Sequence, residues 1–177
     1  MSAPKIFDKT LYARRRGRAA KRFGDHDFLH RRAMEDIVER LEIIQREFPL
    51  AAFEGAGGLL SMLTPRCAVG DIIAIDSAAA RLPKSGLRVA ADAEALPIAP
   101  QSLNLFVSML TLHSANDLVG ALAQARMTLK PDGLFVAAVF AEETLSALRR
   151  ALYAAEAEIM GGVSARIAPF AAIQDYG

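Results

Sequence analysis

The chain has 177 residues, of which 53% are hydrophobic and 23% are charged, and its formal net charge is +1. This length and apolar content suit one domain whose core needs neither metals nor disulfides. The near-zero net charge excludes an overall electrostatic preference for nucleic acid, and no apolar run predicts a membrane span or a secretory signal. The single cysteine, Cys67, cannot form an internal disulfide, so we expect a reducing, cytoplasmic setting.

Residues 1–48 are predicted to form a basic, helical N-terminal segment that precedes the main domain at 49–177. In the second half of this segment, apolar residues recur at spacings of three and four, which is typical of an amphipathic helix. These residues are Ile37, Leu41 and Ile44.

A cluster of arginines and lysines lies between Arg14 and Arg32, interleaved with Phe23 and Phe28. In the simplest interpretation the cluster is a solvated helix face whose phenylalanines pack on the domain. Alternatively, it contacts an acidic partner surface or steers a charged substrate tail. A nucleic-acid interface, which basic residues with interleaved aromatics also fit, ranks last.

After Pro49, short apolar runs alternate with helical segments, which indicates βαβ units. We expect strands at about 51–53, 71–75, 88–91, 103–109 and 133–140, and helices near 58–63, 116–129 and 142–160. Asn116 or Ser114 would cap the second of these helices, and the turn at 130–133 would end it. The sequence therefore predicts an α/β fold with a Rossmann-like, mostly parallel sheet flanked by helices.

A glycine-containing turn, Gly55-Ala56-Gly57, follows the first of these strands, and Asp76 ends the second. Glycines let the backbone approach a ligand at a helix start, and a carboxylate after the next strand accepts hydrogen bonds from ribose hydroxyls. This arrangement predicts a site for a nucleoside-bearing cofactor. NAD would also fit the turn, although Leu60 stands at the third glycine of the dinucleotide motif.

Four motifs follow in a fixed order: Asp76-Ser77 after the second strand, 90–97 after the third, 102–108 as the fourth and 129–135 before the fifth. In this order the chain resembles class I S-adenosylmethionine-dependent methyltransferases. More narrowly, it is similar to the methyltransferase-like assembly factors of mitochondrial complex I and their bacterial relatives, and more distantly to the malonyl-acyl-carrier-protein methyltransferases of biotin synthesis. The narrower resemblance rests on Phe7-Asp8, 14–22, 26–29, Leu112-His113, 116–118, 143–145, Gly161-Gly162 and Pro169-Phe170.

The resemblance implies S-adenosylmethionine as the cofactor and assigns residues to it. The implied contacts are Glu54, Gly55, Ala56, Gly57, Asp76, Ser77, Asp92, Ala93 and Leu110. The glycine turn would hold the methionine part, Asp76 the ribose and Asp92 the adenine amine. Either carboxylate would equally serve as a helix cap. His113, the candidate catalytic group on the reaction side, fits a structural histidine better than a base.

The chain departs from the family's motifs at several positions. Phe53 stands where the family has an acidic residue, and Leu59 where a third glycine lets the methionine carboxylate approach. We expect both departures to weaken S-adenosylmethionine binding. Glu54 would supply the missing carboxylate only through a one-residue register slip, which turns its side chain to the opposite face. Elsewhere Asn104 replaces an aspartate, and Ser114 replaces a tryptophan.

Family members continue with two strands beyond the segment that the last residues of this chain match. We therefore expect the last two strands to be absent and the strand at 133–140 to form an uncovered sheet edge. An uncovered edge favours self-association, which makes a homo-oligomer an expectation.

The sequence thus predicts an S-adenosylmethionine-dependent methyltransferase or methyltransferase-like protein that acts on a protein, an acyl chain or a small molecule. The alternative is an assembly factor for respiratory complex I that binds a protein client, either without catalysis or as a hydroxylase, because the resemblance includes factors linked with arginine hydroxylation. His26, His30 and His113 are scattered, so no metal site is predicted. An NAD-binding oxidoreductase is the further alternative.

Overall fold

A computed structural model describes residues 5–176 of the chain. Residues 1–4 of the predicted N-terminal segment and Gly177 lie outside the described residues. The chain divides after Val139 into two compact units. Within the described residues, no helix has both the length and the apolar character needed to cross a membrane.

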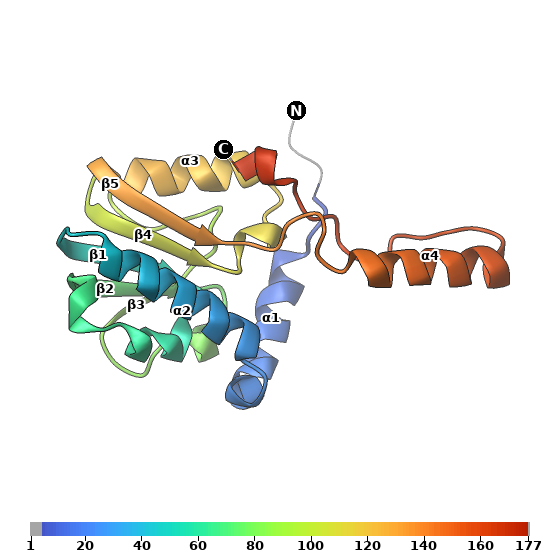
Figure 1. The fold of residues 1–177 in the computed structure, drawn as a ribbon, viewed down its shortest axis with the longest axis horizontal. Helices are drawn as coiled ribbons and strands as arrows, with labels where there is room; N and C mark the ends of the chain where they lie inside the picture. The colour runs from blue at the N-terminus through green and yellow to red at the C-terminus, as the bar shows by residue number, and fades with distance from the viewer. Residues whose placement is uncertain (1–4, 177) are drawn as a thin grey trace. The chain divides into compact units, whose positions relative to one another are not determined.

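The first unit is built on a five-stranded, fully parallel sheet in the order β3-β2-β1-β4-β5 (Figure 1). The strands are β1 (Phe48–Glu54), β2 (Val69–Asp76), β3 (Leu87–Ala90), β4 (Leu103–Met109) and β5 (Leu129–Ala138). The predicted α/β fold and parallel sheet are confirmed. Each strand overlaps its predicted range, and the chain order of strands is the expected one.

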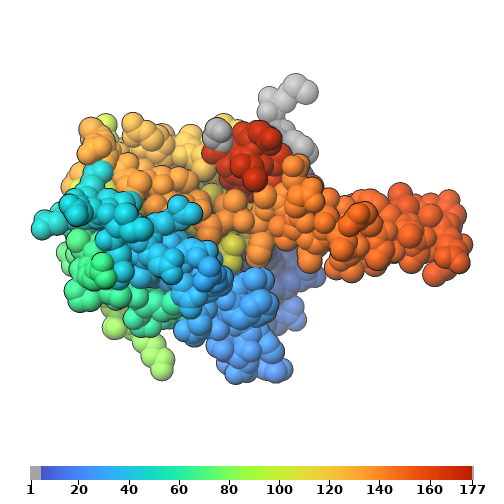
Figure 2. Space-filling model, in the orientation of Figure 1, coloured from blue at the N-terminus to red at the C-terminus, as the bar shows by residue number. Residues whose placement is uncertain are grey.

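Alternate residues of the central strand β1 pack on opposite faces of the sheet, as the period of a strand requires. Phe53 belongs to the apolar cluster of α2 (Phe28–Ile43), whereas Ala52 belongs to the cluster of α3 (Leu118–Thr128). Figure 2 shows α2 spread across its face of the first unit. The register is unslipped: Phe53 pairs with Val107 of β4, and Ala52 pairs with Phe106.

The N-terminal helix α1 (Lys9–Ala19) begins at Asp8, whose carboxylate accepts a 2.8 Å hydrogen bond from the Leu11 amide. A 3₁₀ helix (Ala20–Asp25) then leads to α2. These helices belong to the same compact unit as the sheet. The predicted helix near 58–63 is instead a 3₁₀ helix, Gly57–Met62.

The cap of α3 is Asp117, which accepts a 2.8 Å hydrogen bond from Gly120, and not Asn116 or Ser114 as expected. Asn116 has another role: its side chain binds the backbone of Ile6 and Phe7, just before α1. An amide side chain that donates and accepts is suited to this pairing.

The predicted turn at 130–133 lies inside β5 as an irregularity, so the strand begins four residues earlier than expected. Leu129 pairs with Leu103, whereas Leu134 pairs with Leu105, and Asp132 in between has a left-handed φ of 66°. Among the described strands, β5 pairs only with β4, so its outer edge is unpaired. Self-association through this edge stays a prediction.

The second unit contains α4 (Ser146–Met160) and a short 3₁₀ helix (Ile173–Tyr176). Glu156 of α4 accepts a 2.7 Å hydrogen bond from the Ser164 amide and pairs with Arg166. These contacts hold the segment after α4 against the helix itself.

Candidate functional site

The glycine turn at the end of β1 is packed against the protein's own backbone. Gly55 and Gly57 have φ angles of 80° and 56°, a region that other residues rarely adopt. A Cβ on Gly57 would lie 2.8 Å from the Arg81 carbonyl oxygen, and one on Gly55 would lie 2.7 Å from the Thr111 methyl carbon. Both glycines are therefore required by close contacts within the fold.

Asp76, at the carboxyl end of β2, is fully buried and held by cations. The Arg16 guanidinium donates from Nη2 to Oδ2 at 2.6 Å and from Nε to Oδ1 at 3.2 Å. The Ala78 amide donates to Oδ1 at 2.9 Å, and Arg81 Nε lies 3.6 Å from Oδ2. Although burial alone would lower the pKa of Arg16, its hydrogen bonds and charge pairing with Asp76 raise that pKa.

Arg81 is a second buried cation beside Asp76. Its side chain is 5% exposed, and its guanidinium lies 3.4 Å from the centroid of the Phe23 ring. It also donates a 3.3 Å hydrogen bond to the Gly55 carbonyl. Burial, and then the nearby charge of Arg16, lower the pKa of Arg81. The residue thereby links the glycine turn to the aspartate.

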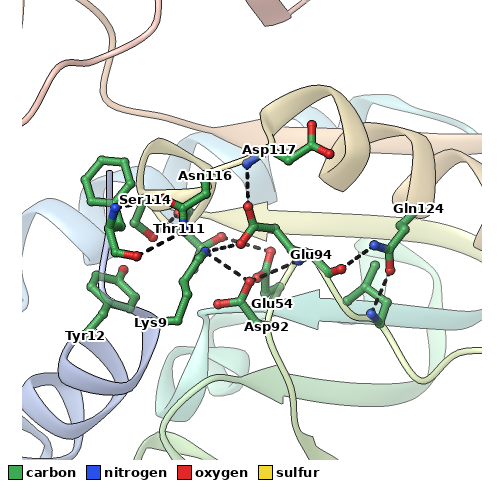
Figure 3. Close-up of polar contacts among 12 residues, drawn as sticks. Lys9, Tyr12, Glu54, Asp92, Glu94, Thr111, Ser114, Asn116, Asp117 and Gln124 are labelled. Carbon is green, nitrogen blue, oxygen red and sulfur yellow. Dashed lines mark hydrogen bonds and ion pairs between the residues drawn. The ribbon is translucent and has the colours of Figure 1, made fainter. Parts of the chain in front are cut away.

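Asp92 follows β3 and is paired with Lys9 of α1. Lys9 Nζ lies 3.1 Å from Asp92 Oδ1 and 2.9 Å from Glu94 Oε2, and Figure 3 shows the ammonium between the two carboxylates. The Asp117 amide donates to Glu94. Although desolvation opposes it, the hydrogen bonds from Asp117 and Lys9 lower the pKa of Glu94. Charged residues of α1 thus reach the ends of both β2 and β3.

Glu54, the last residue of β1, binds hydroxyl groups at and after the end of β4. Its Oε2 lies 2.9 Å from Ser108 Oγ and 2.9 Å from Thr111 Oγ1, and the two hydroxyls are 2.8 Å apart (Figure 3 labels Glu54 and Thr111). Three contacts need three protons, and the two hydroxyls supply only two. Burial raises the pKa of Glu54, and a protonated carboxyl would supply the third proton.

The remaining predicted site residues lie in the segments that follow β1, β2, β3 and β4. Leu110 follows β4 with a left-handed φ of 50°, and its amide donates to Ala138. Ala56 and Ala93 are buried, and Ser77 is half-buried beside Asp76. The structure brings Asp76, Asp92 and the glycine turn to the carboxyl ends of neighbouring strands, while their contact with a cofactor stays a prediction.

His113 lies in the 3₁₀ helix Leu112–Ser114 and is half-buried. Burial, and then the charge of Arg16, lower its pKa to about 4. Its ring is therefore neutral at pH 7. Within the described residues, no group of three or more His, Cys, Asp or Glu side chains is placed to hold a metal ion.

The departures from the motif are explained by packing. Phe53 is 1% exposed and Leu59 is 6% exposed, and both belong to the core cluster beneath α2. Because the register is unslipped, Glu54 does not take the place of the missing carboxylate. Asn104 accepts hydrogen bonds from Leu50 and Lys130, which gives it a structural role between strands.

The basic N-terminal cluster is only partly a solvated face. Arg14, Arg15 and Arg18 are exposed, as the simplest interpretation expects. Lys9 and Arg16, however, turn inward onto the carboxylates of the site. The sequence analysis missed these two residues and Arg81. The spacing of seven places Lys9 and Arg16 on one helix face, but other basic pairs in this segment have the same spacing, so it does not single them out.

A family model described as a methyltransferase domain matches residues 54–137. The matched residues make up just under half of the chain. The match covers the segment from the glycine turn to β5, which contains all of the predicted cofactor contacts.

The relatives support the predicted resemblance. The chain is 38% identical to the mitochondrial arginine-hydroxylase NDUFAF5 of Mus musculus, over 97% of this chain and 53% of that protein. It is 29% identical to a malonyl-[acyl-carrier protein] O-methyltransferase of Methylovorus, over 82% and 55% respectively. The chain thus spans about half the length of the curated relatives that it matches. The expectation of a cytoplasmic setting stays untested, because the name of the first relative places that protein in mitochondria.

Solved structures confirm the fold. An S-adenosylmethionine-dependent methyltransferase of Thermotoga maritima superposes with a TM-score of 0.59 at 20% identity, covering 89% of this chain and 73% of that one. A methyltransferase in complex with the Trm112 activator of Haloferax volcanii gives 0.53 at 20% identity, covering 71% and 62%. The chain therefore has the fold of class I methyltransferases.

Proposed function

We propose that this domain binds S-adenosylmethionine at the carboxyl ends of β1, β2 and β3, for methyl transfer to an acceptor. In an open parallel sheet, ligands bind where the strand order reverses direction, which here is at β1, between β2 and β4. The observation that carries the proposal is the buried carboxylate of Asp76 beside the glycine turn. Asp76 would take the ribose hydroxyls, and Asp92 with Ala93 would face the adenine.

The proposed site offers positioning and exclusion of water rather than covalent chemistry. Methyl transfer from a sulfonium needs the acceptor held in line, and the cofactor supplies the reactive methyl group. The buried apolar side chains of Phe53 and Leu59 stand where an acidic residue and a glycine usually contact the methionine part of the cofactor. We therefore expect weak binding of S-adenosylmethionine. Leu110 would lie on the reaction side.

Arginine modification of a protein client, as in a complex I assembly factor, is the second candidate function. Two observations favour it. The chain is similar to the arginine-hydroxylase NDUFAF5, and the Asp76 carboxylate accepts two hydrogen bonds from the Arg16 guanidinium. A carboxylate placed to bind Arg16 in this way has the geometry to bind the guanidinium of a client.

Calorimetric titration with S-adenosylmethionine and with S-adenosylhomocysteine tests the proposed site, with NAD as the control for the oxidoreductase alternative. We expect binding of the product nucleoside and none of NAD. Asp92→Asn should weaken binding, whereas Asp71→Asn, an exposed aspartate in β2, should leave it unchanged. Equal affinity in the Asp92 variant would remove that residue from the site. Absence of binding to either S-adenosyl compound would contradict the proposal.

A further inference from the structure

We propose that Arg16 and Lys9 of α1 compete with the nucleoside for Asp76 and Asp92, so that the affinity of the site is determined by how readily α1 releases them. The inference rests on the proposed function, because it concerns the same carboxylates. It identifies α1 as the element that sets nucleoside affinity.

The contacts of Asp76 leave too few acceptor positions for both ribose hydroxyls. Oδ1 already accepts from Arg16 Nε and the Ala78 amide, and Oδ2 accepts from Arg16 Nη2 with Arg81 Nε nearby. A carboxylate offers about four acceptor positions. Two ribose hydroxyls can therefore bind Asp76 only after the Arg16 guanidinium leaves it.

The same helix face covers the second carboxylate. Lys9 and Arg16 are two helical turns apart, and Lys9 holds both Asp92 and Glu94. Tyr12 lies between them in sequence on the same face: Arg16 Nη1 donates to its hydroxyl at 3.3 Å. One helix thus occupies the two positions proposed for ribose and adenine.

Apart from its ion pairs, α1 has few contacts that would keep it from moving off the carboxylates. None of its residues is buried, whereas α2 buries Met34, Ile37 and Leu41. A segment with few buried apolar contacts opens more readily than a core helix, so the ion pairs of Arg16 and Lys9 account for most of the free energy needed to release α1. The Asn116 contacts to Ile6 and Phe7 hold the chain just before α1, so these contacts can persist while the helix moves.

Competition of this kind predicts an affinity that rises when α1 is weakened. The apparent dissociation constant equals the intrinsic constant divided by the fraction of molecules with α1 released. Arg16→Gln should therefore bind S-adenosylhomocysteine about tenfold more tightly than the wild type, and Lys9→Gln more tightly by a smaller factor. Arg15→Gln, an exposed position on the same helix, is the matched control and should not change the affinity.

Hydrogen exchange of residues 9–19 gives a second readout that needs no ligand. We expect faster exchange in Arg16→Gln than in Arg15→Gln, and faster exchange in the wild type when S-adenosylhomocysteine is added. If Arg16→Gln does not fold, Lys9→Gln provides the same two measurements, because its ion pairs are more exposed.

The outcomes separate the two proposals. Weaker or equal binding in the folded α1 variants, with clear binding in the wild type, would overturn the competition and leave the proposed function standing. No binding in any variant, with exchange of α1 raised in Arg16→Gln, would overturn the proposed function and the competition with it. Tighter binding without faster exchange of α1 would also overturn the competition.

Discussion

Arg16 and Asp76, sixty residues apart in the chain, form a bidentate ion pair at the carboxyl end of β2. The aspartate side chain is 0% exposed and the arginine side chain 14% exposed. Because β2 adjoins β1, the pair lies beside the glycine turn that follows β1. The pair therefore connects the N-terminal helix to the proposed cofactor site.

Asp76→Asn should destabilise the protein. Removal of the charge leaves Arg16 and the buried Arg81 without their anion, and breaking a buried pair costs about 3–5 kcal/mol. Urea denaturation measures the free energy of unfolding. Asp71→Asn, at an exposed position of the same strand, should stay within about 0.5 kcal/mol of the wild type. Equal losses in both variants would contradict a stabilising role for the pair.

Glu54→Gln should preserve stability, because burial raises the pKa of Glu54 and a neutral amide can take the place of a protonated carboxyl. Glu54→Ala should lose about 1–3 kcal/mol, since it leaves the hydroxyls of Ser108 and Thr111 without their partner. The infrared spectrum of the wild type should contain a protonated carboxyl band that Glu54→Gln lacks and that persists to a higher pH than an ordinary glutamate band. A Glu54→Gln variant as unstable as Glu54→Ala would contradict the protonated state.

The wild type and Glu54→Gln should differ in how their stability depends on pH. Folding raises the pKa of Glu54. Its contribution to the free energy of unfolding is therefore fully present below the unfolded pKa of about 4.3 and is lost as the pH rises through the pKa of the folded state. We expect the stability of the wild type relative to Glu54→Gln to fall as pH increases above this range. Thermal melts of both proteins at a series of pH values measure the difference.

His113 should make the fold sensitive to acid. Its folded pKa of about 4 lies below the unfolded value of about 6.5, so the unfolded chain binds the proton first. Stability should therefore decrease as pH falls from 6.5 toward 4. Titration of the ring by NMR checks the pKa directly. His26→Gln, at an exposed histidine, serves as the control for a His113→Gln variant, which should lose part of the acid sensitivity.

Phe53→Asp should unfold the domain rather than restore the cofactor motif. The Phe53 side chain is buried in the core beneath α2, where truncation of a phenylalanine alone costs about 3–5 kcal/mol and a buried charge adds to the loss. Phe53→Leu, which stays apolar, should lose at most about 1.5 kcal/mol. A soluble, cooperatively folded Phe53→Asp protein with tighter nucleoside binding would refute this account of the motif.

The strands and the strand order were predictable because alternating apolar runs and turn residues report local periodicity. The structure placed β4 at the predicted bounds, Leu103–Met109, since that strand is apolar and bounded by a clear turn. The boundaries of β5 were not predictable, because the irregularity around Asp132 depends on pairing with β4. Local sequence pattern does not encode that pairing.

In the candidate site, the sequence identified the carboxylates but not the residues that hold them. Asp76 and Asp92 follow strands and were found from that position. Arg16 belongs to the basic cluster, which has several exposed members, and Lys9 precedes it; only the fold shows which of these basic residues turn inward. Long-range ion pairs leave no local signal, so the covering of the site by α1 required the three-dimensional arrangement.

A crystal structure of the protein grown with S-adenosylhomocysteine tests the central claim most directly. We predict density for the nucleoside at the carboxyl ends of β1 and β2, with the ribose hydroxyls bonded to Asp76 and the Arg16 guanidinium displaced from it. A ligand bound elsewhere, or an Asp76 still paired with Arg16 beside a bound nucleoside, would contradict the account.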